Sequence, residues 1–123
     1  MTTEQQRNML EAAAKACGYG ELIFRNGADD DGYDNGVWKY TWRRDESGKL
    51  LPWNPITNGL DTAEMCAKLE IDTVWAEEHV VCHVGSEMLY EAIELYEDHD
   101  NSRLRAWMFA ATMCAAKTQG YEE

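Results

Sequence analysis

The chain has 123 residues, with 11 Lys and Arg against 23 Asp and Glu, a formal net charge of -12 at pH 7, and 45% hydrophobic residues including five Trp. At this length we expect a single acidic domain over residues 1–123 that buries a core of its own. No stretch approaches the roughly 18 consecutive apolar residues that cross a membrane, and the first residues lack the basic and then apolar order of a signal peptide. We therefore expect a cytoplasmic protein without a membrane partner.

The acidic residues are concentrated in the second half of the chain. Residues 1–60 contain 7 Lys and Arg against 9 Asp and Glu, whereas residues 61–123 contain 4 against 14. Between Glu70 and Asp100 there are ten carboxylates and neither Lys nor Arg. Because such a run repels phosphate, we expect no direct binding to nucleic acid.

The first half predicts a helix and then a small antiparallel sheet. Helix formers run to Gly18, and the later segments alternate between turn residues and β-formers. The expected elements are a helix over 3–17, a strand over 21–25, a loop over 26–36, a strand over 37–43 with Trp38, Tyr40 and Trp42 on one face, a turn over 45–48 and a return strand over 49–53.

The second half predicts helices on both sides of a short hairpin. The expected elements are a helix over 62–69 capped by Asp61, strands over 71–75 and 79–84 joined by an acidic turn at Glu77 and Glu78, a helix over 86–98, and a last helix from an Asp100 or Asn101 cap to about 118. The helix over 86–98 is preferred to a strand because, at 100° per residue, its apolar residues fall on one side and its acids on the other. The whole order predicts an α+β fold in which three to four helices pack a small antiparallel sheet of four to five short strands in layers.

Two stretches resemble a known group of proteins. The first is Trp53-Asn54-Pro55-Ile56-Thr57 followed by Asp61 and the helix segment from Glu64 to Ile71. The second is Arg103-Leu104-Arg105-Ala106 with the Ala pairs at 110–111 and 115–116. Together they resemble the small bacteriophage proteins of the phage α-β-α sandwich domain type. The resemblance implies a phage origin, hence the host cytoplasm, and a layered α+β fold, and it implies no activity.

The sequence contains two candidate cation sites, and both are weak. In a strand over 79–84, His79 and His83 share a face while Cys82 points to the other, so the three cannot meet on one zinc ion without a bulge. The Asp29-Asp30-Asp31 and Asp34 carboxylates could hold calcium, but no start fits the EF-hand register. We predict neither a metal nor a cofactor, although cation binding by the Asp29 to Asp34 loop stays open.

Catalytic motifs are also missing from the sequence. The serines Ser47, Ser86 and Ser102 do not lie in a Gly-x-Ser-x-Gly turn, and no Gly-rich phosphate loop occurs. The alternation of aromatic and basic residues over 38–44 resembles a base-stacking platform, but it equally describes a strand with one buried and one wet face, which the net charge favours. We therefore expect a non-enzymatic protein with no catalytic residues.

The predicted helix over 86–98 carries the most specific functional hypothesis. Its acids Glu87, Glu91, Glu94 and Asp98 would form a stripe about 16 Å long, with carboxylates spaced broadly like nucleic-acid phosphates. Such a stripe could occupy a basic groove on a host nucleic-acid-binding protein, for instance a CRISPR surveillance complex, so the candidate function is an inhibitor such as an anti-CRISPR that mimics nucleic acid. The partner-binding candidates are Glu77, Glu78, Glu87, Glu91, Glu94, Glu97 and Asp98. Two alternatives stay open, a solubilising helix face and a structural protein that forms a homodimer.

Overall fold

The computed structural model describes residues 1–24, 33–34, 37–39, 41–85 and 89–122. The fold is α+β, as expected, but its strands form two three-stranded antiparallel sheets and one two-stranded ladder rather than one sheet of four to five strands. In chain order the elements are α1 (Thr3–Ala16), β1 (Ile23–Phe24), β2 (Tyr33–Asp34), β3 (Val37–Trp38), β4 (Thr41–Arg44), β5 (Leu50–Pro52), α2 (Gly59–Leu69), β6 (Ile71–Trp75), β7 (His79–Val84), β8 (Leu89–Leu95), the 3-10 helix η1 (Tyr96–His99) and α3 (Arg103–Lys117).

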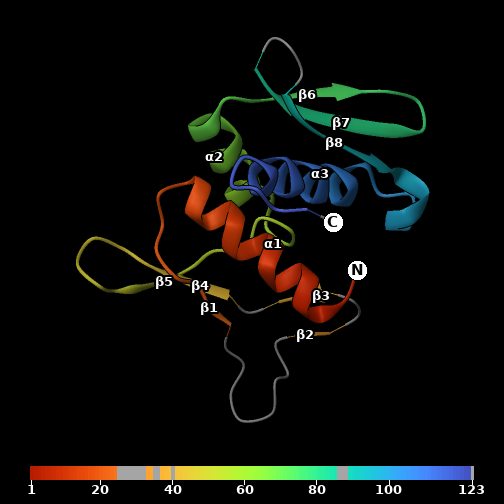
Figure 1. Ribbon diagram of the computed structural model, residues 1–123. Coiled ribbons are helices and arrows are strands. Elements are labelled where there is room, and N and C mark those ends of the chain that lie inside the picture. The colour runs from red at the N-terminus through yellow and green to blue at the C-terminus, as the bar shows by residue number, and fades with distance from the viewer. Residues whose placement is uncertain (25–32, 35–36, 40, 86–88, 123) are drawn as a thin grey trace.

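Helix α3 lies at the centre of the layers (Figure 1). The sheet β6-β7-β8 covers one side of α3, and α1 covers the other, with the β1-β4-β5 sheet beyond α1. The small residues of α3 allow this close approach on both sides, because nine of its residues are buried and five of those are Ala. Met108, Ala111, Cys114 and Ala115 are buried along α3, whereas Leu104 is 56% exposed.

Helix α1 begins and ends as its sequence predicts. Thr2 caps it, and the side chains of Thr2 and Gln5 form a reciprocal capping box with each other's backbone N–H groups. The helix stops before Gly18, which adopts φ +81. Met9, Leu10 and Ala13 recur at the helical period and lie on its buried face.

The expected strand over 37–43 is divided into β3 and β4, which belong to different sheets. Trp38 in β3 pairs with Tyr33 in β2, whereas Trp42 in β4 pairs with Ile23 in β1. The Trp38 backbone is bound by side chains, since its N–H donates to Gln6 Oε1 at 2.7 Å and its carbonyl accepts from Asn54 Nδ2 at 2.6 Å. The predicted single face of 38, 40 and 42 is therefore wrong for Trp38 and Trp42, and Tyr40 lies outside the described residues.

The segment after the β4-β5 hairpin is held by short polar contacts. Asn58, not Asp61, caps α2 by accepting from the N–H groups of Leu60 and Asp61. Asp61 instead accepts from the Asn54 N–H at 2.8 Å. Burial raises the pKa of the Asp61 carboxyl, and the hydrogen bond from Asn54 opposes that rise.

The helix expected over 86–98 is wrong, because this segment contains β8 followed by η1. Strand β8 pairs antiparallel with β7, and the pairing runs from His79 opposite Leu95 to Val84 opposite Leu89. The register shifts between Cys82 and Val84, and Tyr90 there adopts φ 57. The predicted strands over 71–75 and 79–84 are confirmed as β6 and β7, with residue pairs such as Val74 opposite Val81.

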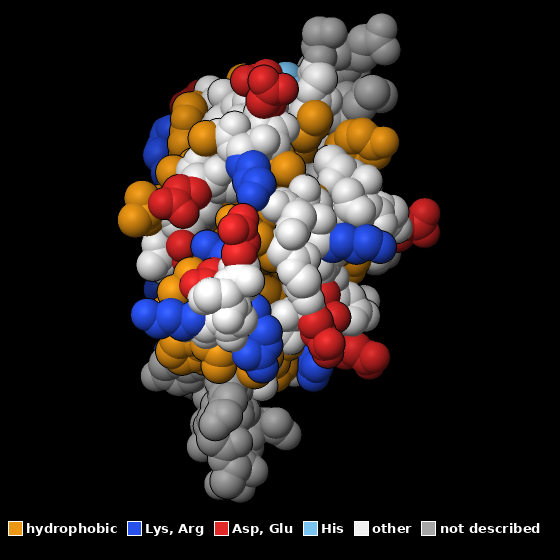
Figure 2. All heavy atoms as spheres, turned by 90° about the vertical axis from the view of Figure 1, so that its left-hand side faces the viewer, with side chains coloured by type: hydrophobic (Ala, Val, Ile, Leu, Met, Phe, Trp, Pro, Cys, Tyr) orange, Lys and Arg blue, Asp and Glu red, His pale blue; other side chains and the backbone are white. Residues whose placement is uncertain are grey.

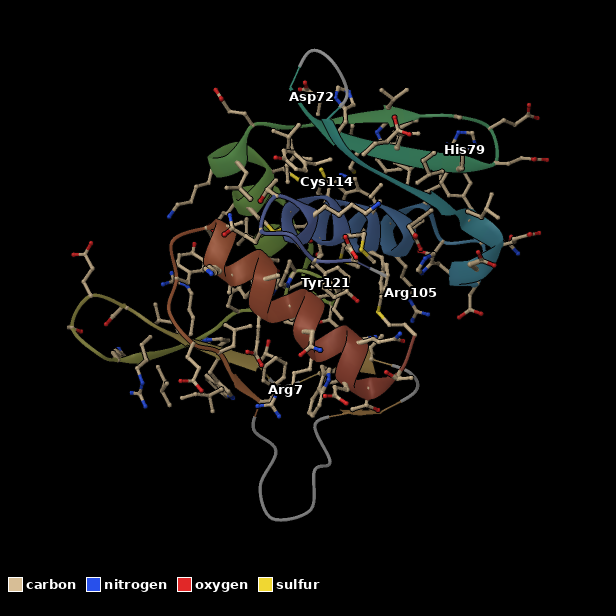
Figure 3. All side chains as sticks on the ribbon, viewed as in Figure 1. Arg7, Asp72, His79, Arg105, Cys114 and Tyr121 are labelled. Carbon is tan, nitrogen blue, oxygen red and sulfur yellow. The ribbon has the colours of Figure 1, made fainter. Side chains whose placement is uncertain are left out.

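The last helix starts later than expected and leads back to α1. Ser102 caps α3 by accepting from the Arg105 N–H, and Asp100 and Asn101 adopt left-handed conformations before it. After α3, the Tyr121 hydroxyl donates to the Gln5 carbonyl at 3.0 Å, which joins the last residues to the first helix (Figure 3). None of the helices in the described part of the chain is long and apolar enough to cross a membrane.

Candidate protein-binding surface

The acidic turn between β6 and β7 lies against η1 at one end of the β6-β7-β8 sheet. The Tyr96 N–H donates to the Glu78 carbonyl at 3.0 Å, and the Tyr96 hydroxyl donates to the Ala76 carbonyl at 2.8 Å. Arg103 packs over the Tyr96 ring, with its guanidinium carbon 4.7 Å from the ring centroid. Tyr96 therefore fixes the turn and η1 relative to each other.

A hollow of about 250 Å³ lies at this end, and three Glu residues line it. Its walls are formed by Glu77, Glu78, Leu95, Tyr96, Glu97 and Asn101. Acceptor groups beside an apolar wall suit a long cationic side chain, whose methylene stem packs against the wall while its charged head meets the carboxylates. We call this feature the acidic hollow.

The predicted partner-binding residues do not form one stripe. Glu77, Glu78 and Glu97 meet at the acidic hollow, whereas Asp98 lines a different cavity and Glu87 lies outside the described residues. Glu91 is half-buried, and its carbonyl accepts from Lys117 Nζ at 2.8 Å. The regular spacing expected from a helix is lost in β8, because a strand directs alternate side chains to opposite faces.

Glu94 is committed to an interaction inside the fold. Its Oε1 lies 2.8 Å from His99 Nε2, and the two side chains are 19% and 16% exposed. The His99 ring also packs against Phe109, with ring centroids 5.3 Å apart. The position of Glu94 therefore indicates a role in holding η1 to the sheet and α3 rather than in contacting a partner.

The larger cavity of the described residues, about 510 Å³, lies between α1, β3, η1 and α3. Met108 and Ile56 supply buried apolar surface, and both signs of charge are present on Asp98, Asp100, Lys39 and Arg105. Arg105 and Asp100 pair at 3.0 Å at an exposed position. The lining includes His99 but neither Ser nor Cys, so it does not supply a Ser–His or Cys–His pair.

The residues of the candidate zinc site lie on opposite faces of β7. Cys82 is fully buried on the α3 side with its Sγ 3.7 Å from Thr73 Oγ1, whereas the His83 ring lies beside the Gly85 carbonyl. Within the described ranges, no three His, Cys, Asp or Glu residues come together as a metal-binding group. The Asp29 to Asp31 carboxylates lie outside those ranges.

The opposite end of the molecule carries basic side chains beside aromatic rings. Arg43 and Lys68 pack over the Tyr19 ring at 4.3 and 4.8 Å from its centroid. Burial raises the pKa of Tyr19, although the Arg43 charge opposes that rise. Figure 2 shows Lys and Arg side chains interspersed with Asp and Glu on the side it presents. The mixed charge on this side therefore contrasts with the three Glu residues that line the acidic hollow.

The outer face of the β6-β7-β8 sheet carries residues that the sequence did not identify as functional. The register places Val74, Val81 and Ile93 in one row across the three strands, and Leu95 lies two residues beyond Ile93. Val74, Ile93 and Leu95 are 48%, 51% and 40% exposed. The available signal was the β-branched residues of β6 and β7, but Ile93 was expected on the apolar side of a helix. We call the surface formed by Val74, Val81, Ile93 and Leu95 the outer apolar face.

Comparisons of the chain with protein-family models, with curated proteins and with solved structures found no match.

Proposed function

We propose that this protein is a non-enzymatic binding protein whose acidic hollow receives a Lys or Arg side chain of a basic host protein. The observation that carries the proposal is the convergence of Glu77, Glu78 and Glu97 beside Leu95 and Tyr96. No Lys or Arg occurs between Glu70 and Asp100 to neutralise these carboxylates from the same segment. Their charge attracts a basic partner from a distance and orients it on approach.

A host protein with a basic nucleic-acid-binding surface supplies the required chemistry. The resemblance to small bacteriophage proteins supports a role during infection, in the host cytoplasm, against a complex that handles nucleic acid. A CRISPR surveillance complex is the most concrete target, which would make the protein an anti-CRISPR inhibitor. The carboxylates would occupy positions otherwise taken by phosphates, but as a local cluster rather than as the regular ladder of a helix.

The test is capture followed by binding to the purified partner. The protein is incubated with nuclease-treated bacterial lysate, the captured protein is identified and purified, and its affinity is measured by calorimetry. We expect Glu77→Gln, Glu78→Gln and Glu97→Gln together to weaken binding at least about tenfold, a free energy of about 1.4 kcal/mol. We also expect the affinity of the unmodified protein to fall as salt is raised from about 0.05 to 0.5 M.

The matched control removes three carboxylates elsewhere, with Glu4→Gln, Glu11→Gln and Glu64→Gln. These residues lie on α1 and α2, away from the acidic hollow. If the control weakens binding as much as the hollow variant, net charge alone attracts the partner. If binding is insensitive to salt and to both variants, the proposed function is wrong.

A structural protein that forms a homodimer is the second candidate, and the outer apolar face is the observation that favours it. Val74 and Ile93 on a sheet face that no described element covers could pack against a second copy. Sedimentation of the unmodified protein at neutral pH distinguishes the two functions. A stable dimer that Ile93→Thr dissociates supports the structural function, whereas a monomer supports binding to another protein.

A further inference from the structure

The two faces of the β6-β7-β8 sheet differ in what covers them. One face packs on α3, where Val80, Cys82 and Ala92 are at most 2% exposed. The other face points away from α3, and no helix or strand of the described residues lies over it (Figure 1). A sheet with one wet face normally alternates apolar and polar side chains, with the polar ones outward. The outer apolar face departs from this pattern.

Val81 shows that the outer apolar face is a continuous patch. It lies in the central strand, opposite both Val74 and Ile93 in the register, and is only 9% exposed although no element covers it. Its neighbours on the sheet therefore shield it, and the register places the apolar side chains of Val74 and Ile93 on either side of it. Contiguous apolar surface surrounded by polar residues is typical of protein interaction sites.

The rim of this patch is acidic and thereby limits what can cover it. Asp72 pairs with His83 on the same face, and Glu77 and Glu78 follow β6 in the turn (Figure 3). A second copy docked by two-fold symmetry would bring the same acidic rim to the interface from both sides. Like charges across an interface oppose association, whereas Lys and Arg on a different protein would pair with the same rim.

We propose that the outer apolar face is the centre of the docking surface, and that its occupant is a different protein with an exposed apolar patch flanked by Lys and Arg. This inference rests on the proposed function and extends it, because Leu95 belongs both to the outer apolar face and to the wall of the acidic hollow. The hollow steers and orients the partner, and Val74, Val81 and Ile93 supply the apolar contact that retains it.

The experiment uses a displayed library of random peptides as the probe. Peptides are selected on the immobilised full chain, and binding rates are measured for those enriched. The face variant carries Val74→Thr and Ile93→Thr, which keep β-branched residues in the strands. The matched control carries Leu60→Gln and Leu104→Gln, which remove two apolar side chains that are 68% and 56% exposed on helices elsewhere. Circular dichroism and urea midpoints verify that each variant is folded.

We expect the selection to enrich peptides in which apolar residues lie next to Lys or Arg. The face variant should dissociate from them at least about tenfold faster with little change in association rate, while the control variant behaves as the unmodified protein. The hollow variant with Glu77→Gln, Glu78→Gln and Glu97→Gln should instead associate more slowly and lose its salt dependence.

Four results would overturn the inference, and they are distinguishable. If only the hollow variant loses binding, the proposed function survives and the outer apolar face is not its centre. If enriched peptides contain no basic residues, or if the chain is a dimer that the face variant dissociates, the proposed occupant, a different protein with flanking Lys and Arg, is wrong. If nothing is enriched on the unmodified protein above the level on the bare support, both the inference and the proposed function fail.

Discussion

At the scale of single residues, the Trp38 backbone explains why an alternating segment becomes two strands. Gln6 accepts from its N–H, and Asn54 donates to its carbonyl. These buried side chains take the place of a neighbouring strand, so the ladder does not continue through this position. Asn54 also accepts from the Ile56 N–H at 3.2 Å, which fixes the chain before α2.

Replacing Asn54 tests this role. Asn54→Ala leaves the buried Trp38 carbonyl without this donor and the Ile56 N–H without this acceptor, so the free energy of unfolding should fall by about 2 to 4 kcal/mol. Urea unfolding followed by Trp fluorescence measures the loss. Asn8→Ala, at an exposed position of α1, is the control and should change stability by less than about 0.5 kcal/mol. Equal effects of the two substitutions would contradict the role of Asn54.

The four cysteines lie in surroundings that disfavour thiolate. Burial raises the pKa of Cys82 to about 11 and the pKa of Cys114 to about 12, and the other two thiols shift in the same direction. Because the thiolate is the reactive form, the folded protein should react slowly with a thiol reagent near pH 8, and the unfolded protein quickly. Absorbance of the released chromophore from a disulfide reagent, with and without guanidinium chloride, measures both rates.

The same shifts predict a loss of stability in alkali. A thiol whose pKa is higher in the folded protein than in the unfolded chain stabilises the folded protein. This contribution to the free energy of unfolding is fully present below the unfolded pKa, about 9.0, and disappears as the pH rises toward the folded pKa. Each thiol can contribute up to about 1.4 kcal/mol per pH unit in this window. The unfolding free energy of the unmodified protein should therefore fall more between about pH 8 and 10.5 than that of Cys114→Ala. Parallel pH profiles would show that Cys114 does not contribute.

At the scale of elements, local periodicity predicted α1, β6, β7 and α3 but misassigned β8. In β6 and β7 the β-branched residues indicate strands directly. In β8, Leu89, Ile93 and Tyr96 have helical spacing, and the register shift beside Tyr90 interrupts the two-residue alternation that would have indicated a strand. Pairing with β7 and burial of Ala92 decide the outcome, and neither is visible in the local sequence.

The candidate site was predictable only where the chain itself brings residues together. Glu77 and Glu78 were expected in a turn and lie in one, and Glu97 joins them through contacts between η1 and that turn. Val74, Val81 and Ile93 meet through the register of three strands, which a single sequence does not specify. The sequence therefore indicated the acidic end of the sheet but not its outer apolar face.

Glu70 offers a test of how α2 joins β6. It ends α2 with φ 56 and ψ 46, a left-handed conformation that costs an L-residue about 1 kcal/mol more than glycine. Glu70→Gly should raise the free energy of unfolding by about 0.5 to 1 kcal/mol, measured by urea unfolding. The matched substitution Glu64→Gly, at an exposed interior position of α2, should lower it by about 1 kcal/mol. A loss of stability with Glu70→Gly would contradict the conformation assigned to this junction.

At the scale of the whole molecule, the net charge of -12 governs self-association. We expect repulsion between copies to oppose self-association near neutral pH, and this repulsion disappears near the sequence isoelectric point of about 4.5. Once the net charge approaches zero, the outer apolar face should pack against other copies. Light scattering between about pH 7 and 4.5 should show the unmodified protein associating, and Val74→Thr with Ile93→Thr should reduce this association. Association at pH 7 that is unaffected by salt would contradict the assignment.

The contact between the Tyr121 hydroxyl and the Gln5 carbonyl brings the two ends of the chain close enough for circular permutation. It holds the two ends within one hydrogen bond of the same helix, and the sheet carrying the proposed docking surface lies on the far side of α3 from α1 (Figure 1). A short flexible linker can therefore connect residue 122 to residue 1, and new ends can be opened in the exposed turn at Ser47 and Gly48. Such a circular permutant would retain every strand pair of the β6-β7-β8 sheet and would place any fused reporter at the β4-β5 hairpin, away from the bound partner.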